Sequence, residues 1–427
     1  MLQVYNKKKQ FGFERSDAVY NGVSVFLCGS LGIFIPIAIG TIYNSDTLGS
    51  FNQIFSIYIV LSQIAALGVH LSVFKHIAEY SDNSHLRSTI LLSGILGATP
   101  IALGISLFLW WGRNLIGDLL YSSVVASGLV WASIALFFFA LNKVFLAAMN
   151  GLSRFKEYAI YQAFRYLFMF SALIGCIMLQ LPGHMIAVIL PVAEGGVFIL
   201  LFISLLPEII HGFSFSLNCW VRKHVEFGLR ACGGHILLDM NTRVDVLFLG
   251  IFFTDQLVGI YSMAAIFAEA CYQLPLVLRT VYNPEVVRLL TQKRIDELKI
   301  LVSHSRKFAW AGTTIMAVVC VIFMLYVLPL ITGHSDYTDG IKYFLVIMAG
   351  MLIAAGYVPV GLMLVNAGFP GRQSFMIMIL VLTNIIGNAI LIPLVGSVGA
   401  ALATAMTYVL SVLLLKIFVN QYLEFSL

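Results

Sequence analysis

Residues 184–206 read HMIAVILPVAEGGVFILLFISLL and contain a single charged residue, Glu194. A membrane-spanning helix needs about 20 predominantly apolar residues, and this stretch is long enough. The stretch is continuously apolar and does not alternate with a period of two, so it predicts a helix rather than a strand of a membrane barrel. The same pattern recurs along the chain, and we expect about twelve transmembrane helices.

The expected spans form two groups of six. The 427 residues are 60% hydrophobic and 11% charged, whereas a soluble domain carries about 25% charged residues. This composition excludes a soluble enzyme and predicts an all-α integral membrane protein. The spans run near 19–43, 50–74, 88–110, 123–147, 159–181 and 184–206, and then near 227–252, 256–281, 308–332, 341–365, 373–394 and 396–419.

Lys and Arg are distributed unevenly between the expected loops. If the N-terminus lies inside, all but four of the 25 Lys and Arg residues fall on the inner side. Arg113 and Lys342 lie outside, and Arg230 and Arg243 fall within a span. Because loops rich in Lys and Arg stay in the cytoplasm, we expect both termini to be cytoplasmic. The net charge of +5 then reflects membrane topology and not nucleic-acid binding.

Two short motifs recur at nearly the same spacing. Residues 48–51 read LGSF and residues 258–261 read VGIY, 210 positions later. Residues 150–154 (NGLSR) and 366–372 (NAGFPGR) are separated by a similar distance. Parallel repeats about an axis along the membrane normal, with a binding site between them, would explain both matches. The expected organisation is a six-helix bundle over 1–206, a cytoplasmic interfacial linker over 207–226 and a second six-helix bundle over 227–427.

The expected seventh span departs from the apolar pattern. Residues 227–245 read FGLRACGGHILLDMNTRVD, and a charge at membrane depth costs about 2.5–3.5 kcal/mol. Helical spacing places His235, Asp239 and Arg243 on one face. We interpret this helix as lining a polar cavity, where Arg230 and Arg243 attract an anionic group such as a phosphate. The alternative is an Asp239–Arg243 ion pair that only neutralises its own charges.

Other charged residues lie inside or near the ends of apolar spans. Glu194 and Glu269 fall near mid-span, where a carboxylate is either a proton or cation relay or a buried structural acid. Lys143, Arg165 and Arg279 fall near inner helix ends, where snorkelling to lipid phosphates explains them. The alternative for these three is contact with a phosphate-bearing substrate that arrives from the inner leaflet.

The sequence lacks the common motifs of catalysis. It contains no P-loop, no HExxH, no GxSxG and no Cys/His cluster with metal-ligand spacing. We therefore expect no cofactor, no metal and no catalytic residue. Transport without ATP hydrolysis by the chain itself is the function class that remains.

Part of the chain resembles a known family. The stretch 239–290 and the ending 392–404 are similar to the middle and the last two helices of bacterial polysaccharide-transport flippases of the Wzx type. These flippases belong, with MATE-type multidrug exporters and lipid II flippases, to the multidrug/oligosaccharidyl-lipid/polysaccharide exporter superfamily. The residues that carry the resemblance are RVD at 243–245, LFLG at 247–250, VGIY at 258–261, the stretch 264–275, Pro284, and IPLVGSVGAALAT at 392–404.

The resemblance implies a MATE-like fold and a lipid substrate. Such proteins move an undecaprenyl-diphosphate-linked oligosaccharide repeat unit from the cytoplasmic to the periplasmic leaflet of the bacterial inner membrane. The unit is then used for O-antigen or a related surface polysaccharide, so a polymerase and a chain-length regulator are expected partners besides membrane lipids. Alternating access of the two halves is the expected mechanism.

The resemblance also suggests roles for the charged residues. Arg230 and Arg243 are the candidates for binding the diphosphate. Ion-gradient coupling would involve Asp239, Asp245, Glu194 or Glu269, with His235 as a further polar residue of the cavity. Lys143 and Arg279 are the candidates for access from the inner leaflet. One departure is that spans 19–43 and 50–74 lack the arginines that lipid II flippases carry in their first two helices.

Three other functions are open at this stage. A multidrug or cation exporter on the same fold would present acidic residues, without arginines, to its cavity. A membrane glycosyltransferase or polysaccharide polymerase would need a larger outer loop with catalytic polar residues, whereas the longest outer loops expected here have about a dozen residues. A structural scaffold would not need the charges of residues 227–245. We therefore expect a transporter and not an enzyme.

Overall fold

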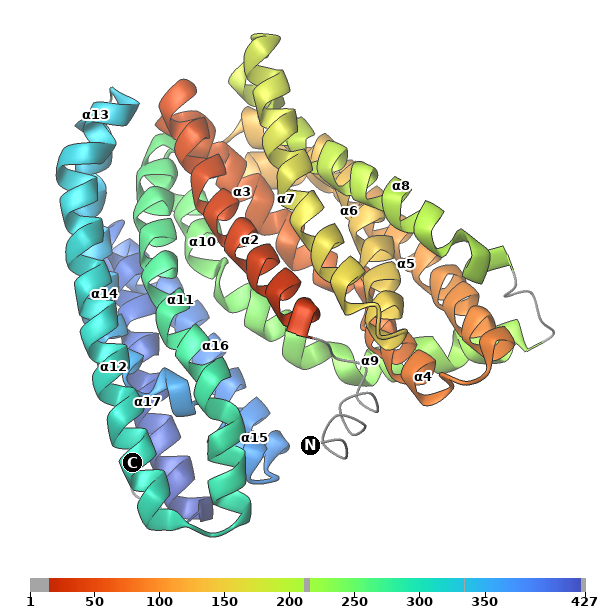
Figure 1. Cartoon of the computed structure of the whole chain (residues 1–427). Coiled ribbons are helices and arrows are strands. Elements are labelled where there is room, and N and C mark those ends of the chain that lie inside the picture. The colour runs from red at the N-terminus through yellow and green to blue at the C-terminus, as the bar shows by residue number, and fades with distance from the viewer. Residues whose placement is uncertain (1–14, 211–215, 334, 424–427) are drawn as a thin grey trace. The chain divides into compact units, whose positions relative to one another are not determined.

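The computed structural model describes residues 15–210, 216–333 and 335–423, and those residues form helices and short turns without strands (Figure 1). Among the described residues, eleven helices are long and apolar enough to cross a membrane. They confirm the all-α membrane fold and coincide with eleven of the twelve expected spans. The first six are α2 (Arg15–Ile42), α3 (Ser45–Ala66), α5 (Ser84–Leu119), α6 (Ser123–Gly151), α7 (Phe155–Met178) and α8 (Ile189–Ile210). The others are α11 (Asp255–Thr291), α12 (Ile295–Ile322), α14 (Ile341–Ala355), α16 (Pro370–Val395) and α17 (Val398–Leu423). The span of α12 continues through helical turns to Thr332, and that of α14 begins with a helical turn at Asp336.

The chain divides into two compact units. One comprises Met1–Pro36 with Ile54–Asp239, and the other comprises Ile37–Gln53 with Met240–Leu427. Helices α2 and α3 therefore each contribute residues to both units. The expected organisation into 1–206, 207–226 and 227–427 stays a prediction.

The core of the first unit is formed by α4 (Val69–Glu79) with α5, α6 and α8. Fully buried aliphatic and aromatic side chains such as Val73, Leu91, Phe145 and Leu201 fill it. Burial of this kind contributes about 25 cal/mol for each Å² of apolar surface removed from water, although in a membrane protein it is tight packing that selects the partners.

The expected second span, 50–74, is interrupted in the structure. Helix α3 ends at Ala66, and α4 begins at Val69 after a turn in which Gly68 has a φ of +66°. Glycine adopts this left-handed conformation without steric cost. The turn also lies against Gly228, because a Cβ on Gly228 would overlap the carbonyl oxygen of Leu67. The turn therefore ends α3 where another backbone approaches it.

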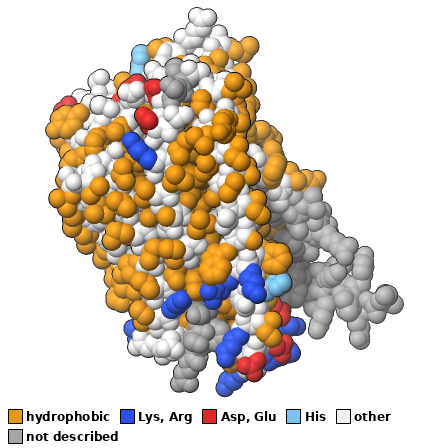
Figure 2. Space-filling model, turned by 90° about the vertical axis from the view of Figure 1, so that its left-hand side faces the viewer, with side chains coloured by type: hydrophobic (Ala, Val, Ile, Leu, Met, Phe, Trp, Pro, Cys, Tyr) orange, Lys and Arg blue, Asp and Glu red, His pale blue; other side chains and the backbone are white. Residues whose placement is uncertain are grey.

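The core of the second unit lies among α11, α12, α14 and α17. Val302, Leu364, Val412 and Val419 are buried there. On the face that bears α12, side chains are largely hydrophobic across the middle, and most of the Lys and Arg side chains gather toward one end (Figure 2). This is the pattern of a helix surface that meets hydrocarbon in its middle and a polar interface at its end.

The expected seventh span is not one helix. Two residues separate helix α9 (Leu217–Asn241) from helix α10 (Val244–Phe252), and the second of them is Arg243. The prediction of a continuous span over 227–252 is therefore wrong. Helix α9 as a whole contains five charged residues, whereas Asp245 is the only one in α10, so the break falls where the polar and apolar halves of the segment meet.

Candidate substrate-translocation site

A buried ion pair lies inside the first unit. Arg165 of α7 places its Nε 2.9 Å from Oε1 of Glu194 on α8, and the two side chains are only 14% and 2% exposed. Each is the only charged residue of its expected span, 159–181 for Arg165 and 184–206 for Glu194. A buried charge is tolerated when an opposite charge and further hydrogen bonds compensate it, so the packing of α7 on α8 depends on this pair.

Two further helices reach the same carboxylate. Tyr58 of α3 donates its hydroxyl hydrogen to Oε1 of Glu194 over 3.1 Å. Asn142 of α6 donates through Nδ2 to both Oε2 and the backbone carbonyl of Glu194, each over 2.9 Å. Four helices therefore meet at Glu194. We name the four residues Arg165, Glu194, Tyr58 and Asn142 the Glu194 cluster.

Two cationic side chains share one aromatic ring beside this cluster. The guanidinium carbon of Arg165 lies 5.0 Å from the centroid of Phe139, and Nζ of Lys143 lies 5.3 Å from it. Lys143 also donates a hydrogen bond to Oε1 of Gln63. The interpretation of Arg165 as a residue that snorkels to lipid is wrong, because its charge is paired inside the unit. Single opposite charges in two consecutive spans were the sequence signal for this pair.

The second unit holds a separate polar group at the start of α10. Asp245 is 8% exposed and accepts hydrogen bonds from the Tyr261 hydroxyl over 2.6 Å and from the backbone N–H of Val246 over 2.9 Å. Nearby, Nδ2 of Asn384 on α16 donates to the backbone carbonyl of Asn241 over 3.0 Å. These bonds fix the junction between α9 and α10 against α11 and α16.

Arg243 is placed differently from its expected position. It is the residue that precedes α10, it is partly buried, and its φ of −124° lies outside the helical range. Because α9 ends at Asn241, the helical spacing that would align Arg243 with His235 and Asp239 is broken. Arg243 instead stands at the N-terminus of a short helix, where the helix dipole adds positive potential.

The remaining candidate residues are dispersed. Arg230 is exposed on α9, Glu269 is exposed on α11, and Arg279 is partly buried on α11. The backbones of His235 and Asp239 belong to α9, but their side chains lie outside the described residues. No group of three or more potential metal ligands occurs among the described side chains.

Most of these residues lie in a region of the sequence that matches a known protein family. Residues 33–284 match the family described as "Polysaccharide biosynthesis protein". The chain belongs to this family. The matched region covers more than half of the sequence and includes the Glu194 cluster, the junction at Arg243 and Glu269. The resemblance to polysaccharide-transport flippases is therefore confirmed at the level of the family. No curated protein sequence matches the chain.

Several solved structures have the same fold as this chain. The lipid II flippase MurJ in an inward closed conformation has a TM-score of 0.75 at 17% identity, over 94% of this chain and 87% of that one. A multidrug resistance MATE family transporter of the MOP superfamily, in an inward-facing conformation, has a TM-score of 0.76 at 11% identity, over 93% and 94% of the chains. The MATE multidrug transporter DinF-BH gives 0.60 at 16% identity, over 96% and 95%.

These comparisons agree with the helices described above. The chain is a multi-pass membrane protein with the fold of flippases and multidrug transporters, and its family and fold are those of transporters and not of enzymes. At these identities the structural likeness concerns the fold and not the substrate.

Proposed function

We propose that this protein is a flippase for an undecaprenyl-diphosphate-linked oligosaccharide in the bacterial inner membrane. It would carry the repeat unit of O-antigen or a related polysaccharide from the cytoplasmic to the periplasmic leaflet. The observation that carries the proposal is that each unit holds an arginine that is at least partly buried among its helices, Arg165 in one and Arg243 in the other. A lipid diphosphate is anionic, and arginine binds phosphate oxygens through two parallel hydrogen bonds.

The junction at Arg243 is suited to the diphosphate. A guanidinium and the N-terminus of α10 both favour negative charge at the same place, as in transporters whose interrupted helices direct half-helix N-termini at anionic substrates. Arg230 would supply a second cation from the exposed surface of α9. Lys143 and Arg279 would attract the diphosphate as it arrives from the inner leaflet.

The Glu194 cluster supports coupling to an ion gradient. Glu194 is a buried carboxylate that pairs with Arg165 and also bonds to Tyr58 and Asn142. A carboxylate inside a membrane bundle is typical of ion pathways in transporters. Alternating access of the two halves would then move the substrate to the periplasmic leaflet.

The location of the lipid-linked repeat unit tests this function. Cells depleted of the protein would be probed with a reagent that modifies the sugar head and does not cross the inner membrane. We expect protected, cytoplasmic units in depleted cells and restored exposure with the wild-type chain. Arg243→Ala at wild-type protein level should leave the units protected, while Arg294→Ala should restore exposure, because Arg294 is a surface residue paired with Glu297.

Other outcomes would contradict the proposal. Units that reach the outer face without being polymerised after depletion would identify a polymerase. If depletion of the protein left the distribution of lipid-linked sugar unchanged, the protein would not be a flippase of this substrate. Resistance to cationic dyes in cells that express the protein would then favour a multidrug exporter. A polymerase and a chain-length regulator are the partners that we propose to take up the translocated unit.

A further inference from the structure

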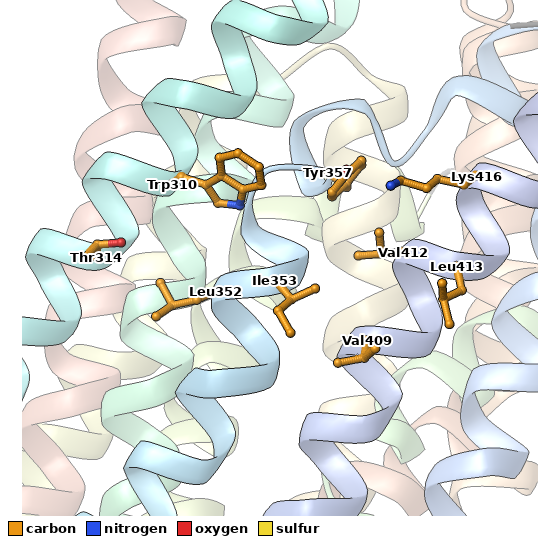
Figure 3. Close-up of a pocket in the computed structure, with 9 residues that line it drawn as sticks. All are labelled: Trp310, Thr314, Leu352, Ile353, Tyr357, Val409, Val412, Leu413 and Lys416. Carbon is orange, nitrogen blue, oxygen red and sulfur yellow. The ribbon is translucent and has the colours of Figure 1, made fainter. Parts of the chain in front are cut away.

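An apolar groove opens between three segments of the second unit. It encloses about 500 Å³ and is formed by α12, by the end of α14 with the turn after it, and by α17 (Figure 3). Trp310, Tyr357 and Lys416 lie in one row across it, and the amine of Lys416 points toward the ring of Tyr357. Leu352 and Leu413 are among the aliphatic residues on one side of that row. The groove is thus polar along one edge and apolar beyond it.

Two cations pack on the aromatic rings of the polar edge: Lys416, which lines the groove, and Arg306, which lies beside it on α12. The guanidinium carbon of Arg306 lies 4.5 Å from the ring centroid of Tyr357 and 5.0 Å from that of Trp310. Nζ of Lys416 lies 4.9 Å from the same Tyr357 centroid. Two positive groups on one ring repel each other, and this repulsion is relieved when an anion lies near both.

Within the residues that the structure describes, neither cation has an acidic partner: neither Arg306 nor Lys416 forms an ion pair with Asp or Glu. Nε of Arg306 is buried and has no hydrogen-bond acceptor among the described residues. A buried N–H without an acceptor is costly, so the hydrogen-bonding capacity of this guanidinium is not fully satisfied within those residues.

The apolar side of the groove is open laterally. Ile353 and Leu413 are 49% and 52% exposed, although both are aliphatic residues of membrane helices. Tryptophan, tyrosine and basic residues at this position in a helix are typical of the boundary between lipid headgroups and hydrocarbon. A ligand of the groove therefore has a negative headgroup and a hydrocarbon chain.

We propose that this groove binds an anionic phospholipid, with its phosphate between Arg306 and Lys416 and an acyl chain along Leu352, Val412 and Leu413. The site lies wholly within the second unit and uses none of the residues assigned to substrate transport. The lipid would hold α12, α14 and α17 together at their shared end. The proposal does not depend on which molecule the protein transports.

Lipid titration of the purified full-length protein tests the site. Native mass spectrometry would count bound phosphatidylglycerol and phosphatidylcholine that carry identical acyl chains. We expect tighter binding of phosphatidylglycerol to the wild type, and an affinity lower by about tenfold or more in Arg306→Gln/Lys416→Gln. Lys307→Gln is the matched control, because Lys307 is the exposed neighbour of Arg306 on α12, and it should leave the affinity unchanged.

Two further variants separate the headgroup from the chain and protect against misfolding of the double variant. Arg306→Lys keeps the charge and should keep most of the affinity. Leu413→Trp keeps both cations and fills the apolar wall, so it should weaken phosphatidylglycerol binding. Unchanged binding in both the double variant and Leu413→Trp would overturn the proposal.

Competition experiments distinguish a phospholipid from other molecules that carry phosphate. Displacement of phosphatidylglycerol by an equal concentration of inorganic phosphate would show a site for free phosphate. Displacement by undecaprenyl diphosphate at equal concentration would assign the groove to the transported lipid. Equal affinity for phosphatidylcholine and phosphatidylglycerol would show that the aromatic and basic residues only anchor the helices at the membrane interface. Each of these results would overturn the proposal, and resistance to both competitors would support it.

Discussion

Gly49 of α3 and Gly259 of α11 lie against each other in a reciprocal backbone contact. A Cβ on Gly49 would overlap the carbonyl oxygen of Asp255, and a Cβ on Gly259 would overlap the carbonyl oxygen of Ser45. In each case the carbonyl belongs to the residue four positions before the opposing glycine. Such reciprocity is the signature of a local two-fold relation, in which equivalent residues meet. The recurring motifs at 48–51 and 258–261 therefore have a structural counterpart.

Substitution of either glycine should destabilise the protein. Gly49→Ala and Gly259→Ala each place a methyl group against backbone atoms that cannot move independently, and such overpacking costs about 1–3 kcal/mol or more. Thermal unfolding in detergent would measure the loss. Gly104→Ala on α5 is the control, because nothing lies within 4 Å of its added Cβ. Equal melting temperatures for Gly49→Ala and Gly104→Ala would show that the contact has room for a side chain.

The Arg165–Glu194 pair should show strong energetic coupling. Glu194→Met leaves Arg165 buried without its partner and should lower the free energy of unfolding by about 3–5 kcal/mol. Arg165→Met/Glu194→Met removes both charges and should recover most of that loss. A double-mutant cycle on unfolding free energies provides the measurement.

A surface pair provides the comparison for this cycle. Arg154 and Glu157 are an i,i+3 pair with side chains 31% and 39% exposed, and such pairs contribute about 0–1 kcal/mol. The cycle on Arg154 and Glu157 should therefore give a much smaller coupling energy. Coupling energies of the same size at both pairs would mean that burial does not govern the Arg165–Glu194 interaction.

The membrane helices could be predicted because an apolar run of fixed length is a local signal. Interruptions were harder to predict. The turn at Gly68 depends on Gly228, which is far away in the sequence, and the break at Arg243 depends on bonds such as that from Asn384 to Asn241. A hydropathy pattern contains no information about such partners, so both segments were predicted as continuous spans.

Tyr261 should stabilise the protein through Asp245. Tyr261→Phe removes the hydroxyl that donates to this buried carboxylate over 2.6 Å, and loss of one such bond costs about 1–3 kcal/mol. The melting temperature should fall accordingly. Tyr326→Phe, at a side chain that is 72% exposed, should leave it unchanged. A Tyr261→Phe protein as stable as the wild type would show that another donor replaces the hydroxyl.

Acidification should loosen the start of α9. His224 precedes the expected seventh span and is fully buried, with Nε2 3.2 Å from the carbonyl of Ile90 and Nδ1 2.8 Å from the Ser72 hydroxyl. Burial, with a smaller effect from His76, lowers the pKa of His224 to about 4, whereas an unfolded histidine has a pKa of about 6.5.

The sign of the pH effect follows from these values. The folded state disfavours the protonated ring, so the unfolded segment binds more protons between pH 6.5 and pH 4. Stability is fully present above about pH 6.5 and falls by on the order of 3 kcal/mol as the pH drops toward 4. The other charged groups around this site are Glu79, which bonds to His76, and Lys75 and Lys223.

Hydrogen exchange of residues 217–226 provides the measurement. Exchange should accelerate between pH 6.5 and 4 beyond the intrinsic dependence of the amide reaction. His224→Gln keeps hydrogen-bonding groups but does not titrate. In this variant, hydrogen exchange should therefore follow only the intrinsic pH dependence of the amide reaction. The same acceleration in the wild type and in His224→Gln would assign the effect to another group.

The candidate site could be predicted only in part. The residue types were visible in the sequence, because any charge within an apolar run stands out. Their partners were not, since helical spacing gives the faces of one helix and not which helix lies opposite. The sequence alone does not decide whether Glu194 is a relay or a structural acid, because the convergence of Arg165, Tyr58 and Asn142 on it is a property of the fold.

The division of the seventh segment into α9 and α10 affects how the chain is made. Helix α10 has nine residues, too few to cross the bilayer by itself, and α9 carries the charged residues. The translocon releases a segment into lipid according to its own hydrophobicity, so neither helix is a strong insertion signal. If α9 and α10 together add a crossing to the eleven candidate spans, the nascent chain needs helices already in the membrane to receive them. The orientation of everything after residue 252 is then decided by folding during biosynthesis.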